Sequence, residues 1–262
     1  MTELLSQCDP TGRFSDRVDY YVRSRPRYPS ALLEFCREQL GLDAHHRVAD
    51  IGSGTGFLSE PFLRNGNTVF AVEPNAAMRA AAEKALGKFP NFHSVDARAE
   101  STGLENSSVD FITAGQAFHW FDRVRCREEF QRILRPGGRV MLIWNERKMD
   151  DDPFAQAYET VVREFQTDLN RVKHQHVTAT DSNAMTAFYS PGQYGTASFP
   201  NPQTLDLQGL IARALSSSYL PLPGQPRCQR MLDRLGEIFS AHAQSGKVHQ
   251  DYETKIFYGQ LN

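Results

Sequence analysis

The chain has 262 residues, which is enough for one large α/β domain or one such domain with a small appendage. Its formal net charge of −2 argues against a surface that coats nucleic acid. No apolar run approaches the ~18 residues of a membrane span, and the first residues lack the apolar core of a signal peptide, so we expect a cytoplasmic protein.

Cysteine and histidine patterns give no sign of a metal centre. The four cysteines include no C-x-x-C pair and are expected to be free thiols. His174 and His176 have no cysteine or carboxylate cluster beside them, so a polar loop is the better interpretation. We therefore expect no metal.

The first half of the chain alternates strands with helices. After a polar and aromatic segment that ends in prolines near residue 29, helical patterns are predicted over 30–41, 56–65, 75–87 and 123–134. Apolar strands are predicted over 47–51, 68–72, 91–95, 109–113 and 139–144. Short links between alternating strands and helices predict right-handed crossovers and a parallel sheet.

The pattern changes after Glu146. A helix is predicted over 152–169, and helical patterns return at 207–218 and 226–244. Between them, the polar region 170–203 lacks clear periodicity and is predicted to be a mobile lid rather than a second core. The last strand, 248–258, alternates as a half-exposed antiparallel strand does.

The turn after the first strand carries glycines at positions 52, 54 and 56. Glycine lets the backbone turn sharply and lie against a ligand, and the N–H groups at the start of the next helix can bind a polar group. A dinucleotide fingerprint would need its third glycine where Phe57 stands. Asp50 before the turn and Glu73 after the second strand complete the motif.

This D-x-G-x-G-x-G motif with its downstream acid resembles the cofactor loop of class I S-adenosylmethionine-dependent methyltransferases, in the type-11-like group. Residues 71–75, 95–97 and 116–122 extend the resemblance, which is nearest to the small-molecule subgroup of trans-aconitate methyltransferases. The resemblance implies an α/β, Rossmann-like seven-stranded, mostly parallel sheet with helices on both faces and an antiparallel C-terminal hairpin strand. It also implies an N-terminal lid and helix (1–40), a cofactor-binding core (41–149), a variable substrate-side helical insertion (150–220) and a C-terminal helix and strand (221–262).

The resemblance implies S-adenosylmethionine as the cofactor. Glu73 is then expected to accept from the ribose hydroxyls, Asp96 and the N–H of Ala97 to bind adenine, and Asp50 to hold the methionine amine. The carbonyl of Gln116 is expected to accept from the same amine. The full predicted cofactor set is Asp50, Gly52, Ser53, Gly54, Gly56, Glu73, Pro74, Met78, Asp96, Ala97 and Gln116. Met78 and Phe118 can instead be core residues.

On the substrate side, His119 follows the fourth strand and is a candidate general base, with a pocket-shaping role as the alternative. An arginine of the N-terminal segment could pair with a carboxylate of the cofactor or the substrate. The predicted substrate pocket is Tyr20, Arg25, Tyr28, His119, Trp120 and Asn145. Further candidate wall residues are Phe188, Tyr189, Tyr194, Arg213 and Tyr219.

The predicted function is methyl transfer to a small-molecule acceptor, with O-methylation of a carboxylate as a candidate, by in-line displacement. A methyltransferase acting on RNA or protein is an alternative, although no N-P-P-Y signature follows the fourth strand. A non-catalytic cofactor-binding protein and an NAD-dependent oxidoreductase are the others. We expect no nucleic-acid or membrane partner, and a monomer or homodimer.

Overall fold

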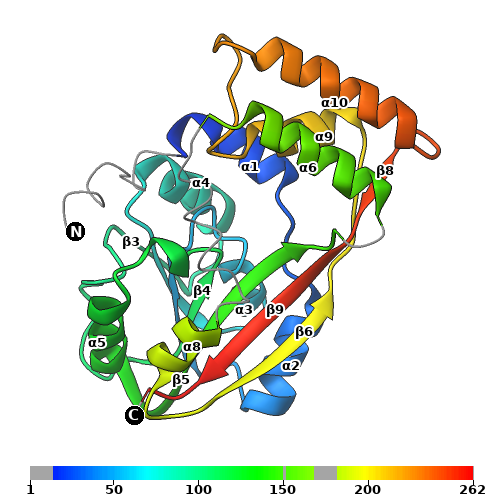
Figure 1. The fold of residues 1–262 in the computed structure, drawn as a ribbon. Helices are drawn as coiled ribbons and strands as arrows, with labels where there is room; N and C mark the ends of the chain where they lie inside the picture. The colour runs from blue at the N-terminus through cyan, green and yellow to red at the C-terminus, as the bar shows by residue number, and fades with distance from the viewer. Residues whose placement is uncertain (1–13, 150–151, 168–181, 262) are drawn as a thin grey trace.

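The structure is a computed structural model and describes residues 14–149, 152–167 and 182–261. Its central sheet consists of β1 (Arg47–Ile51), β2 (Thr68–Val72), β3 (Phe92–Val95), β4 (Val109–Gly115), β5 (Leu134–Arg147), β6 (Tyr194–Pro200) and β9 (Tyr252–Gly259). The seven strands lie in the order β3-β2-β1-β4-β5-β9-β6 (Figure 1). Neighbours among β1 to β5 are parallel, whereas β9 is antiparallel to both β5 and β6. The predicted mostly parallel sheet with an antiparallel C-terminal strand is confirmed.

Helices cover both faces of the sheet, so successive strand residues enter different cores. Val48 packs in a cluster with α2 (Ser30–Leu40) and α3 (Ser59–Arg64). Its neighbour Ala49 packs in another cluster with α5 (Arg123–Ile133) and α8 (Ser182–Tyr189). Because both faces are covered, the parallel strands are continuous apolar runs, which is why they can be recognised in the sequence.

A second helical layer lies beyond the carboxyl end of the parallel strands (Figure 1). It contains α6 (Pro153–Phe165), α9 (Leu207–Leu215) and α10 (Cys228–His242), which share an apolar cluster of their own. A small antiparallel two-stranded sheet of β7 (Gln203–Leu205) and β8 (Val248–Gln250) contributes to this cluster. We call these elements the helical cap.

The N-terminal segment is fastened to the cap. It forms the short helix η1 (Ser15–Arg17) and α1 (Val18–Ser24), and Arg17 donates to the carbonyls of Leu215 and Leu220 at 2.8 and 2.7 Å. Leu215 ends α9, so the arginine also meets the negative end of that helix dipole. Residues 1–13 lie outside the described residues, so the lid and helix expected over 1–40 are described from residue 14 onward.

Residues 182–200 differ from the expectation of a mobile lid, because they join the central core. Met185, Phe188 and Tyr189 of α8 are buried, and the Tyr189 hydroxyl donates to the Phe257 carbonyl at 3.0 Å. β6 then pairs with β9 as the outer strand of the sheet. Its residues are half-exposed or exposed and mix polar with apolar side chains, as in an edge strand, so they carry no strong hydrophobic signal. His174 and His176 lie outside the described residues.

Two further differences are smaller. The last predicted strand is divided at Asp251, so that β8 belongs to the cap and β9 to the central sheet. No helix within the described residues is both long and apolar enough to cross a membrane.

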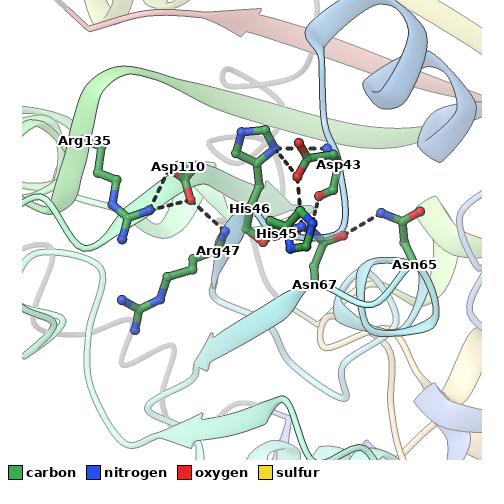
Figure 2. Close-up of polar contacts among 8 residues, drawn as sticks. All are labelled: Asp43, His45, His46, Arg47, Asn65, Asn67, Asp110 and Arg135. Carbon is green, nitrogen blue, oxygen red and sulfur yellow. Dashed lines mark hydrogen bonds and ion pairs between the residues drawn. The ribbon is translucent and has the colours of Figure 1, made fainter.

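Polar contacts fix β1 at its amino end, away from the strand end where the glycine turn begins (Figure 2). The backbone N–H of Arg47 donates to Asp110 at 2.8 Å, and Arg135 pairs with the same carboxylate at 3.0 Å. The Asn67 amide donates to the Asp43 carbonyl at 2.7 Å. These contacts tie β1 to β4 and to the loop before β2, so the opposite strand ends are held in register.

Candidate active site

Two adjoining cavities open at the carboxyl ends of the parallel strands, where open α/β sheets bind ligands. They share a wall made of Tyr21, Gly52, Gly54, Gly115 and Gln116. We call one the Glu73 chamber, which is also lined by Pro74, Met78, Arg98 and Trp120. We call the other the Arg213 chamber, which is also lined by Arg25, Tyr28, Asp50, Ser53 and Asn145.

The glycine turn contributes Gly52 and Gly54 to the shared wall. Gly52 has φ +67°, and a Cβ on it would lie 2.6 Å from the Cβ of Ala117. Gly54 has φ +57° and leaves the backbone open to the cavity beside Met78. Gly56, predicted in the cofactor set, lines neither chamber: a Cβ there would overlap Leu86 of α4 (Ala76–Leu86). Its role is close packing of the turn on α4.

Glu73 directly follows β2, and two backbone amides hold its carboxylate beside the glycine turn. One carboxylate oxygen accepts from the Gly54 N–H at 2.9 Å, and the other accepts from the Asn75 N–H at 2.8 Å. The side chain is buried, and burial raises its pKa against the opposing effect of these two amides and of Arg79. Each oxygen keeps a further lone pair, so this carboxylate can accept hydrogen bonds from a ligand.

Asp50, in β1, is fully buried beneath the same turn. Its oxygens accept from the hydroxyls of Ser59 at 2.6 Å and Thr113 at 2.9 Å. Burial, with a smaller contribution from Glu73, raises the pKa of Asp50 to about 6, while the two hydroxyls oppose the rise. A cationic group arriving in the Arg213 chamber would favour its ionised form.

Asp96 and Ala97, predicted to bind adenine, do not line the Glu73 chamber. The Asp96 side chain is 67% exposed and pairs with Arg79 at 2.7 Å, outside the cavity. Instead Arg98, Ala99 and Glu100, a few residues further along the loop after β3, line the chamber. The sequence predicts which loop lines the cavity, but not which of its residues point into the cavity.

Gln116 joins the two chambers at the end of β4. It is one of the non-glycine residues with positive φ, +56°, and its N–H donates to the Ile143 carbonyl at 2.9 Å. Its side-chain amide donates to the Asn145 carbonyl at 2.8 Å. The backbone therefore turns sharply at Gln116, and hydrogen bonds of its main chain and its side chain hold it there. Such a left-handed residue is typical of a position that shapes a ligand site.

The aromatic residues that follow β4 point in different directions. Trp120 lines the Glu73 chamber and meets Phe14 edge-to-face at a ring distance of 6.5 Å. Phe118 is fully buried in the core. His119 lines neither chamber; its ring lies against Trp120 at 4.9 Å between centroids. The short helix η2 (Phe118–Trp120) separates these side chains, so its geometry does not support His119 as a general base.

The Arg213 chamber brings together Arg25, Tyr28 and Asn145, three of the residues that we expect in the substrate pocket. Arg25 donates to the Ser216 hydroxyl at 2.9 Å and to the Ser216 carbonyl at 3.0 Å. Burial raises the pKa of Tyr28 well above its usual value. Tyr20 does not line either chamber, because it packs against the apolar cluster of the cap.

Of the further wall candidates, Arg213 lines the second chamber and donates to the Tyr252 hydroxyl through Nε and Nη2 at 3.2 and 3.0 Å. Phe188 and Tyr189 belong to the central core, Tyr194 packs against it, and Tyr219 packs on the cap cluster.

Comparison with known proteins identifies the part of the chain that contains the glycine turn, Glu73 and Gln116. Residues 49–142 match a family model described as a methyltransferase domain. These residues belong to that methyltransferase family. The match covers the strands β1 to β4 and the glycine turn, and the family implies S-adenosylmethionine as the cofactor.

Curated relatives of this chain are named methyltransferases, and a solved structure shares its fold. An uncharacterised methyltransferase of Mycobacterium tuberculosis is 37% identical over 142 residues, which cover 54% of this chain and 56% of that protein. One of Schizosaccharomyces pombe is 30% identical over 135 residues, covering 51% and 53%. The chain thus matches about half the length of these curated relatives. A candidate methyltransferase structure from Anabaena variabilis shares the fold, with a TM-score of 0.65 at 21% identity over 91% of this chain and 99% of that one.

The residues of the methyltransferase domain fit S-adenosylmethionine chemically. Glu73 offers acceptor lone pairs for the two ribose hydroxyls, and Gly54 leaves the backbone uncovered beside it. Among the described residues, the hydroxyls of Ser53 and Thr55 are buried without a hydrogen-bond partner, and both line the Arg213 chamber next to Asp50. Buried hydroxyls without partners are unfavourable, so they suit the polar methionine end of the cofactor.

Several cavity residues were not predicted. Phe14 and Tyr21 line the Glu73 chamber together with Arg98, Ala99 and Glu100. Tyr21 lies in the segment expected to cover the site, so its composition gave a partial signal. Phe14 had none, because an aromatic residue near a turn is far more often a core residue.

Proposed function

We propose that the protein transfers a methyl group from S-adenosylmethionine to a small-molecule acid, with a carboxylate oxygen as the methyl acceptor. The observation that carries the proposal is the pair of chambers with a common glycine wall. One contains the buried carboxylate of Glu73, and the other contains two arginines, Arg25 and Arg213. The glycine turn and Asp50 provide polar contacts for the cofactor, and the two arginines on the remaining wall of the second chamber favour an anionic acceptor.

When bound, S-adenosylmethionine supplies an electrophilic methyl group on a sulfonium. The chain's own residues bind and orient. Glu73 accepts hydrogen bonds in one chamber, while Asp50, Ser53 and Thr55 provide polar contacts at the turn. Tyr21 of the N-terminal segment and Arg213 of the helical cap line the site and reduce the access of water.

A carboxylate acceptor needs no general base. Carboxylic acids are ionised at neutral pH, so their oxygen is already a nucleophile. This agrees with the position of His119 outside both chambers. The proposed reaction therefore does not use His119 as a general base.

A small acceptor is supported by the way the Arg213 chamber is enclosed. Its walls come from the N-terminal segment, the glycine turn, β5 and the cap, with Arg25, Ser53, Asn145 and Arg213 as representatives. Arg25 is bonded to Ser216 of the cap side, so a polymer could enter only if this contact opened.

Parallel calorimetric titrations with S-adenosylmethionine, S-adenosylhomocysteine and NAD test the cofactor. Binding of the first two and none of NAD is expected. A panel of carboxylic acids is then incubated with methyl-labelled cofactor, and base-labile methyl esters are counted. NAD binding alone would refute the cofactor assignment. Methylation of RNA or protein without any acid product would refute the acceptor class, and cofactor binding with no transfer to any of them would favour a non-catalytic binder.

A further inference from the structure

The Arg213 chamber carries an excess of positive charge. Within the described part of the chain, neither Arg25 nor Arg213 forms an ion pair with a carboxylate. Their partners are the neutral groups of Ser216 and Tyr252. The one acid among the described lining residues is Asp50, whose two oxygens are taken by Ser59 and Thr113.

Most donor capacity of the two guanidiniums is unused by the protein. A guanidinium has about five N–H donors. Arg213 directs Nε and Nη2 at Tyr252, and Arg25 directs Nε and Nη2 at Ser216, so Nη1 of each is without a described protein partner. Both side chains are half-buried, and the charge of Arg213, after burial itself, lowers the pKa of Arg25. Two cations that share a cavity are stabilised by an anion between them.

The position of Arg213 assigns this anion to the acceptor rather than to the cofactor. Glu73 and the glycine turn lie at the ends of β2 and β1, on one side of the sheet order. Arg213 is anchored on Tyr252, the first residue of β9, which lies on the far side of β5. Ser53 and Thr55 offer unpartnered hydroxyls on the turn itself, so the polar end of the cofactor has partners without Arg213.

We propose that Arg213, assisted by Arg25, anchors an anionic group of the acceptor that is not the group being methylated. This inference rests on the proposed function. Methyl transfer to a carboxylate oxygen forms an O–CH₃ bond, breaks the S–CH₃ bond and removes the negative charge of the acceptor oxygen. A guanidinium bonded to that oxygen would stabilise the charge that is lost and would slow the step. The anchored anion is therefore a second group, and Arg213 determines specificity for acceptors that carry two acidic groups.

The test uses the full chain saturated with S-adenosylhomocysteine, into which glutarate, butyrate and inorganic phosphate are titrated. Glutarate has two carboxylates, butyrate has one, and phosphate distinguishes a phosphate anchor from a carboxylate anchor. The variants are Arg213→Met, which removes the charge, and Arg213→Lys, which keeps the charge and loses the planar fork. Arg230→Met, at an exposed arginine of α10 whose side chain is 74% exposed, is the matched control.

We expect wild type to bind glutarate more tightly than butyrate, and Arg213→Met to weaken glutarate binding by at least about tenfold. Arg213→Lys should fall between the two, and Arg230→Met should equal wild type. The affinity for S-adenosylhomocysteine should change by less than about threefold in every variant. Tighter binding of phosphate than glutarate, with the same dependence on Arg213, would support the anchor with phosphate as its ligand.

Three results would overturn the inference: glutarate affinity independent of Arg213, no binding of any of the three anions to wild type, or an equal loss of S-adenosylhomocysteine affinity in Arg213→Met. The last would mean that Arg213 binds the cofactor. Failure of wild type to bind S-adenosylhomocysteine would instead refute the proposed function. Thermal melting of each variant verifies that it is folded.

Discussion

Replacing Asp50 by asparagine should stabilise the protein at neutral pH while weakening the cofactor site. The Asp50 side chain is completely buried and accepts hydrogen bonds from Ser59 at 2.6 Å and Thr113 at 2.9 Å. Hydroxyl groups rotate and can either donate or accept, so an asparagine amide can keep both contacts. The main effect of the substitution is then removal of a buried negative charge.

The size of the effect follows from the pKa. Burial, followed by the smaller repulsion from Glu73, raises the pKa of Asp50 from 3.8 to about 6. A difference of about 2.2 pKa units, at ~1.36 kcal/mol each, corresponds to ~3 kcal/mol. Because the folded pKa is the higher one, the ionisation penalty is absent below about pH 4, grows as the pH rises to about 6, and is complete above that.

Urea unfolding followed by tryptophan fluorescence at several pH values measures this difference. Asp50→Asn should raise the free energy of unfolding by up to about 3 kcal/mol near pH 8 and by almost nothing near pH 4. Asp96→Asn, at a carboxylate whose side chain is 67% exposed, is the control and should show no pH-dependent gain of this size. A difference between wild type and Asp50→Asn that is the same at all pH values would refute the reasoning.

Four further outcomes are expected. If the methionine amine pairs with Asp50, binding of S-adenosylhomocysteine should release protons near pH 6 but not near pH 8, because only near pH 6 is Asp50 partly protonated. Proton release is measured as a difference in binding heat between buffers of different ionisation enthalpy, and equal heats at both pH values would contradict this. Glu73→Gln should weaken S-adenosylhomocysteine binding by about tenfold or more through loss of charge-assisted hydrogen bonds, and unchanged calorimetric affinity would remove Glu73 from the site. Gly52→Ala should abolish cofactor binding because its Cβ has no room, whereas Gly41→Ala, also at positive φ but with nothing within 4 Å, should lose only ~1 kcal/mol of stability and keep the affinity. His119→Gln should keep kcat within about threefold of wild type, and a loss of about 100-fold would restore the role of general base.

Short-range patterns in the sequence determined the fold of the first half of the chain. Strands such as β1 and β4 are buried on both faces, so most of their residues are apolar and they stand out from the amphipathic helices between them. The glycine turn was equally local, because Gly52, Gly54 and Gly56 all have positive φ and a Cβ at Gly52 would overlap Ala117. Glu73 was predictable for the same reason, since the end of a parallel strand fixes which edge of the sheet it reaches.

Orientation within loops was decided by the tertiary structure. Asp96 is in the expected loop, but Arg79 of α4 pairs with it outside the cavity. His119 follows β4 as expected, but the short helix η2 leaves Trp120 as the residue that lines the chamber. A few residues of loop can point a side chain inward or outward at nearly equal local energy, so contacts with other elements select the direction.

Long-range pairing decided the rest. β6 has no strong pattern of its own, and it is a strand because β9 offers an unpaired edge some fifty residues later in the chain. The Arg213 chamber needs Arg25 from the N-terminal segment, Asn145 from β5 and Arg213 from the cap in one place. The sequence by itself determined the elements and the cofactor turn, because these depend on neighbouring residues. Only the tertiary structure decided where the two arginines meet, because that depends on how distant elements pack.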